Sequence, residues 1–142
     1  MGLDNALYIK GKTIKGKKFL AEHYNLLEKY GNKYEFFYSR KCWNIRNRFL
    51  EVFQDKDYDG QGGEFEIEVA ELVDVVEHIL KYFLNEKNWN YDGGGANGSI
   101  WEWHTMVVKI AESIRVIRLF LEDYEDYELS EDDFEITFID SY

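Results

Sequence analysis

The chain has 142 residues, of which 45% are hydrophobic and 18% aromatic, so it has the length of one domain and is too apolar to remain unfolded. Its single cysteine excludes an internal disulfide and favours a reducing compartment, and no stretch approaches the roughly 18 apolar residues of a membrane span. A net charge of −11 argues against direct contact with nucleic acid or a membrane surface.

The first half of the chain alternates between predicted strands and helices. Residues 7–10 form a short apolar strand, and apolar residues then recur at helical spacing from residue 19 to residue 30. Residues 34–38 are rich in aromatic side chains, which is typical of a strand. A helix with one apolar side is predicted over residues 40–54.

The second half continues with two helices between two strands. Residues 64–68 alternate polar and apolar side chains, as a half-buried strand does, and residues 69–83 have the 3-4-3-4 spacing of an amphipathic helix. A long helix is predicted over residues 99–121, opened by a capping box of serine and glutamate. Residues 134–140 alternate again and predict a final strand.

The order of these elements predicts an α+β fold, with three to four helices packed on a small, mostly antiparallel sheet. We expect residues 7–10 and 134–140 to share that sheet, because each segment is too short to be stable alone and their charges are opposite. No linker, repeat or low-complexity segment marks a boundary, so residues 1–142 are predicted to form a single domain. The N-terminal residues lack the pattern of a signal peptide, so we expect a cytoplasmic protein.

Two short motifs suggest a family resemblance. Residues 1–4 (Met-Gly-Leu-Asp) lead directly into a Leu-Tyr-Ile-Lys strand, and residues 38–41 (Tyr-Ser-Arg-Lys) precede an aromatic helix. This pattern resembles a group of small uncharacterised proteins encoded by bacteriophages and prophages. The similarity extends to the acidic loop, strand and helix at 55–72 and to the long helix and aromatic strand at 99–142. The resemblance implies a phage or prophage setting, so the expected cytoplasm is that of a host cell, and it carries no established activity.

Residues 55–66 match the calcium loop of the EF-hand, in which clustered carboxylates and a turn glycine surround a hard dication. The candidate ligands are Asp55, Asp57, Asp59 and Glu66. Against a calcium site, a glycine replaces the aliphatic residue that would pair with a second loop, and the last ligand lies inside a predicted strand. We favour a solvated acidic connection and no cofactor, with calcium kept as the alternative.

No other motif indicates catalysis. Residues 93–98 contain G-x-G-x-x-G, but they follow a polar segment instead of a strand, so we favour a turn-forming loop over a phosphate site. The three histidines lack the spacing of metal ligands, and Cys42 lies on an apolar helix face, as a buried thiol does. A protein without enzymatic activity is the interpretation we favour, and a small enzyme with a pocket near His104 is an alternative.

Trp101 and His104 lie one turn apart on the predicted long helix, away from the centre of its apolar stripe. Two interpretations remain open. These residues could form an exposed aromatic patch for a partner, or they could belong to a wide buried face of the helix. We favour the buried face, and keep Trp101 as a candidate for partner binding.

The charge is divided unevenly, because residues 1–50 hold 11 basic and 4 acidic residues and residues 51–142 hold 6 basic and 24 acidic ones. A strongly negative segment attracts basic partners. We therefore favour a phage-type accessory protein that binds a basic surface on a host protein. In its concrete form it would be a nucleic-acid mimic that inhibits a host defence protein or another nucleic-acid-binding protein. The candidate contact residues are Glu125, Asp126, Glu131, Asp132, Asp133 and Trp101.

Another interpretation of the same charge is also open. The acidic segment could be a face kept for solubility, and basic residues near the N-terminus could partly neutralise it. The lysines in question are Lys10, Lys12, Lys15, Lys17 and Lys18.

Overall fold

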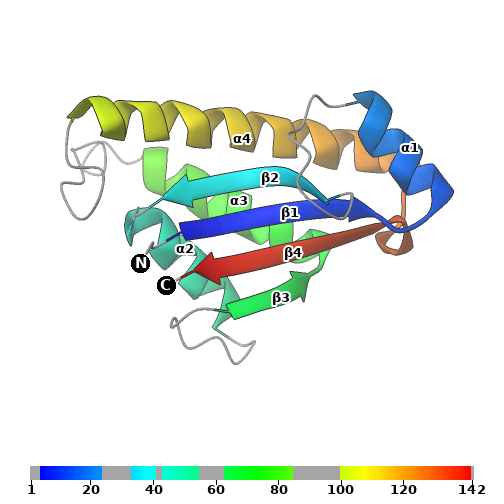
Figure 1. Cartoon of the computed structure of the whole chain (residues 1–142), viewed down its shortest axis with the longest axis horizontal. Helices are drawn as coiled ribbons and strands as arrows, with labels where there is room; N and C mark the ends of the chain where they lie inside the picture. The colour runs from blue at the N-terminus through cyan, green and yellow to red at the C-terminus, as the bar shows by residue number, and fades with distance from the viewer. Residues whose placement is uncertain (1–3, 24–32, 41–42, 55–62, 85–99, 142) are drawn as a thin grey trace.

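The computed structural model describes residues 4–23, 33–40, 43–54, 63–84 and 100–141. Within them, four helices pack against a four-stranded antiparallel sheet (Figure 1), which confirms the predicted α+β class. The strands are β1 (Asp4–Gly11), β2 (Lys33–Arg40), β3 (Gly63–Ile67) and β4 (Phe134–Ser141). The helices are α1 (Ile14–His23), α2 (Trp43–Phe53), α3 (Val69–Leu84) and α4 (Ile100–Asp126), and a single 3-10 turn, η3 (Glu131–Asp133), precedes β4.

The first and last strands are neighbours at the centre of the sheet, which has the order β2-β1-β4-β3. β1 pairs antiparallel with β4 along its whole length, which confirms that the two segments share one sheet. Opposite charges meet at one pair, Lys10 and Glu135. Apolar burial contributes more to this pairing, because Leu7 lies opposite Phe138 and both side chains are fully buried.

An aromatic cluster fills the core between the sheet and α2. Phe138 of β4 is fully buried, and its ring centroid lies 4.7 Å from that of Phe49 and 5.0 Å from that of Phe53, both on α2. The ring of Phe65 on β3 lies 5.3 Å away, and Phe37 of β2 packs edge-on against Phe49. The last strand therefore holds both α2 and the edge strand β3 in place.

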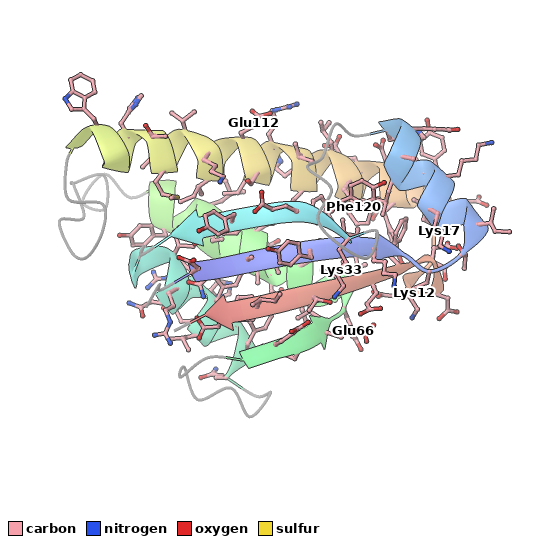
Figure 2. All side chains as sticks on the ribbon, viewed as in Figure 1. Lys12, Lys17, Lys33, Glu66, Glu112 and Phe120 are labelled. Carbon is pink, nitrogen blue, oxygen red and sulfur yellow. The ribbon has the colours of Figure 1, made fainter. Side chains whose placement is uncertain are left out.

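The long helix α4 runs along the β2 edge of the sheet (Figure 1). Among the described side chains of α4, those of Ile110, Ile114, Ile117 and Phe120 are buried on the side that faces the sheet. The Phe120 ring lies 5.2 Å from that of Phe36 on β2. Figure 2 shows Phe120 pointing toward the sheet and Glu112 on the opposite side of the helix. One side of α4 is thus left to solvent over most of its length.

No helix in the described ranges is both long enough and apolar enough to cross a membrane. The edge strand β3 has only five residues and carries exposed Glu64 and Glu66. Short, charged edge strands resist pairing with strands of other molecules. The sheet edge is therefore a poor docking surface, and the candidate site lies elsewhere.

Candidate functional site

Exposed carboxylates gather at the C-terminal end of α4, in the turn that follows it and in η3. We call four of them, Glu125, Asp126, Glu128 and Asp132, the acidic end. Glu128 adopts the left-handed backbone conformation, with φ of 51°, where the chain turns away from α4. The four side chains form no ion pair within the described part of the chain. Glu128 is an addition to the predicted set, because its position in the turn was not evident from the sequence.

Glu131 was predicted to contact a partner, and the structure gives it a second role. Its side chain is exposed, but its Oε1 atom accepts a hydrogen bond of 2.9 Å from the backbone amide of Val69. Val69 is the first residue of α3, where free amides and the helix dipole favour a carboxylate. Glu131 therefore joins η3 to α3, and its carboxylate is already engaged with the first amide of α3 in the free protein.

Asp133 was also a predicted contact residue, and the structure shows its carboxylate engaged within the fold. Only 8% of Asp133 is exposed. Its Oδ1 atom accepts a hydrogen bond of 2.6 Å from the Thr13 hydroxyl, and its Oδ2 atom accepts one of 2.9 Å from the Ser130 amide. These two bonds, helped by the charge of Lys15, hold the pKa of Asp133 below its usual range despite burial. The carboxylate therefore fastens η3 to the start of α1.

The lowered pKa of Asp133 predicts a loss of stability in acid. The ionised carboxylate stabilises the fold fully above the ordinary carboxyl pKa, and this contribution is lost as pH falls through the lower folded-state pKa. We expect Asp133→Asn to be less stable than the wild type at pH 7, and the difference to shrink below about pH 4. Urea unfolding at pH 7, 5 and 3 measures it. Asp132→Asn is the control, since that exposed side chain should show no difference at any pH. A difference for Asp133→Asn that does not change with pH would contradict this role.

The lysines near the N-terminus lie at the same end of the molecule as η3, as Figure 2 shows for Lys12 and Lys17. The backbone amide of Lys12 donates to the Asp133 carbonyl oxygen at 2.8 Å, and the Lys15 ammonium donates to the Glu128 carbonyl oxygen at 3.4 Å. No lysine of this group forms an ion pair with a carboxylate among the described residues. The lysines therefore lower the local negative potential without covering the acidic end.

Trp101 lies at the opposite end of α4 and is 79% exposed, and His104 is exposed as well. The buried helix face that we favoured for these two residues is therefore wrong. Among the described side chains of α4, the first buried one is Ile110. α4 contacts the sheet through β2, where the Phe120 ring packs against that of Phe36. Trp101 stands 25 residues before Asp126, which is about 37 Å along a helix. One molecule thus keeps Trp101 apart from the acidic end.

The predicted calcium ligands Asp55, Asp57 and Asp59 lie outside the described residues, as do residues 93–98 and Cys42. Glu66 is exposed on β3, on the sheet face shown toward the viewer in Figure 2. In the ranges that the structure describes, no three histidine, cysteine or carboxylate residues are grouped closely enough to hold a metal ion.

A buried polar row at one end of the sheet was missed by the sequence interpretation. Ser39, Asn5 and Asp140 lie side by side on β2, β1 and β4. The Asn5 amide donates to Asp140 at 2.7 Å, and Arg46 of α2 donates through Nη2 at 3.2 Å and through Nε at 3.4 Å. All four residues are buried. A signal was present, because Asp140 has the same strand parity as the buried Phe138.

This buried polar row has a structural role. A buried carboxylate is costly unless it is paired and hydrogen-bonded, and Asp140 meets both conditions. Within the described part of the chain, the Oδ1 atom of Asn5 and the hydroxyl of Ser39 are buried without a hydrogen-bond partner. Asn5 and Ser39 lie opposite each other in the β1–β2 pair.

Scanning protein-family models and searching curated proteins and solved structures gave no match to this chain.

Proposed function

We propose that this protein is a phage-type acidic accessory protein that acts by binding, and that its acidic end occupies a basic surface on a host protein. The observation that carries the proposal is the acidic end itself, where Glu125, Asp126, Glu128 and Asp132 form no ion pair with any described residue, although exposed lysines lie at the same end of the molecule. The phage setting rests on the resemblance of residues 1–4 and 38–41.

Clustered carboxylates at a helix end have a cost in the free protein. They repel one another, and Glu125 and Asp126 also lie at the negative end of the α4 dipole. A basic partner relieves both effects, so the electrostatic gain on binding is larger than for scattered charges. Basic protein surfaces commonly bind the phosphates of nucleic acid. The proposed target is therefore a nucleic-acid-binding or defence protein of the host, whose site the acidic end would block as a mimic.

The test compares two charge-reversal variants that change the net charge equally. Glu125→Lys/Asp126→Lys alters the acidic end, and Asp74→Lys/Glu77→Lys alters two exposed carboxylates on α3. Host-lysate proteins retained by the wild type and the α3 variant, but lost by the first variant, identify the partner. Association with the purified partner is then followed by stopped flow at several salt concentrations.

We expect the acidic-end variant to associate about tenfold more slowly at low salt, because steering of this kind changes association rates by roughly 10- to 1,000-fold. The difference should shrink at high salt, since charges are screened beyond about 10 Å at 0.1 M. Equal rates for both variants would show that the acidic end serves solubility alone. Both variants should remain folded, because exposed charges contribute little to stability.

A further inference from the structure

The solvent side of α4 carries three exposed apolar residues in a line. Trp101 is 79% exposed, Val108 54% and Leu119 39%. An α-helix turns by about 100° per residue, so positions 7 and 18 residues apart fall within about 20° of one line. We call these three residues the α4 stripe. Removing large apolar side chains of this kind from water is favourable, so the stripe is a surface that favours binding to a partner.

An ion pair interrupts the α4 stripe between Val108 and Leu119. The Nη2 atom of Arg115 lies 2.6 Å from the Oε1 atom of Glu112, and each side chain is about 60% exposed. The hydrogen bond from Arg115 holds the pKa of Glu112 below its usual range, so both groups are charged at neutral pH. The middle of the stripe thus presents one negative and one positive group next to each other along the helix.

The stripe is complementary to itself when its direction is reversed. We propose that two copies of this chain associate through antiparallel α4 helices, about a two-fold axis that passes between Glu112 and Arg115. In this arrangement Val108 packs against the partner's Leu119, and Glu112 meets the partner's Arg115. Each contact occurs twice, as the symmetry of an isologous dimer requires. The proposal is independent of the proposed function, because it needs no host protein.

The charges select the antiparallel arrangement over the parallel one. Parallel helices would place Glu112 against the partner's Glu112 and would bring both acidic ends together. Antiparallel helices hold the two acidic ends at opposite ends of the pair, about 37 Å apart along α4. That separation is well beyond the screening length of about 10 Å at 0.1 M salt. The helix dipoles are also opposed.

The dimer also brings together residues that one molecule keeps apart. Trp101 of each protomer falls opposite the partner's Asp126, and therefore beside the partner's acidic end. The aromatic residue and the carboxylates of the predicted contact set then form one composite surface at each end of the dimer. Only one helix from each protomer makes the contact, which is small for a stable interface, so we expect dissociation in the micromolar range.

Sedimentation equilibrium over a range of about 5 to 500 µM tests the proposal, since a micromolar dimer dissociates across this span. The wild type should change from monomer to dimer. Glu112→Arg and Arg115→Glu should each weaken the dimer at least tenfold, because each creates two repulsive contacts in the symmetric pair. The double variant Glu112→Arg/Arg115→Glu exchanges the two charges and should restore the wild-type affinity. Leu119→Glu should be monomeric, and Glu77→Arg on α3 serves as the control.

Two outcomes would overturn the proposal. The first is a wild type that remains monomeric at the highest concentration. The second is a dimer that persists in Glu112→Arg and Leu119→Glu, which would place the interface elsewhere. Thermal unfolding of each variant shows whether the fold is intact. These variants leave Glu125 and Asp126 unchanged, so a failure here is separate from a failure of the proposed host binding.

Discussion

Replacing Phe138 with alanine is expected to lower the free energy of unfolding by about 3–5 kcal/mol. The ring is fully buried at the centre of the sheet, where it contacts the rings of Phe49, Phe53 and Phe65. Its removal leaves a cavity between β4 and α2 that the surrounding backbone cannot close. Domains are stable by only about 5–15 kcal/mol, so this single change should bring the protein close to unfolding at room temperature.

Urea unfolding followed by circular dichroism measures the loss. Phe138→Leu is the matched variant, because it keeps most of the apolar volume and should lose about 1–2 kcal/mol. Ile14→Ala is the surface control, since Ile14 is 85% exposed and should change stability by less than about 0.5 kcal/mol. A loss below about 1 kcal/mol for Phe138→Ala would mean that the aromatic cluster does not hold the core together.

Arg46→Met is expected to be destabilising by a similar amount, about 3–5 kcal/mol. The variant removes the guanidinium that pairs with the buried Asp140 carboxylate, to which Asn5 still donates a hydrogen bond. The main cost is the loss of the cation that lies 3.2 Å from this buried carboxylate. For a domain of this size each kcal/mol shifts the melting temperature by roughly 2–4 °C, so we expect a decrease on the order of 10 °C.

The double variant Arg46→Met/Asp140→Asn distinguishes charge from packing. Asparagine removes the buried charge, and its side-chain oxygen can still accept the hydrogen bond from Asn5. The double variant should therefore recover a large part of the stability lost in Arg46→Met. If the two variants unfold at the same temperature, Arg46 contributes through its packing and not by balancing the charge of Asp140.

Local patterns in the sequence were sufficient for the elements that alternate or repeat regularly. The final strand and α3 were predicted within one or two residues, because their side-chain periodicity depends only on neighbours in the chain. The start of α1 was predicted too late. Its first turn has an exposed Ile14 and several lysines, which do not give the apolar spacing of a helix. The real start is marked by Thr13, whose hydroxyl accepts a hydrogen bond from the Gly16 amide.

The candidate site depended on contacts that no local pattern contains. Asp133 belongs to an acidic run that is typical of a solvated segment, yet it is buried against Thr13, which is 120 residues away. The exposure of Trp101 depends on which side of α4 meets β2. The pairing of Arg46 with Asp140 joins positions 94 residues apart. Charge and composition indicated the acidic end, and the fold determined which carboxylates remain available.

The position of β4 also has a consequence for folding during synthesis. β4 is the last of the described strands to be synthesised. It lies between β1 and β3, and each of these two strands pairs with β4. Until it emerges, one side of β1 exposes its backbone groups, and β3 has no neighbouring strand in the described sheet. Contacts between distant parts of a chain slow folding and leave earlier segments open to aggregation. We therefore expect the nascent chain to depend on chaperones until residues 134–141 are available, and then to fold in one cooperative step.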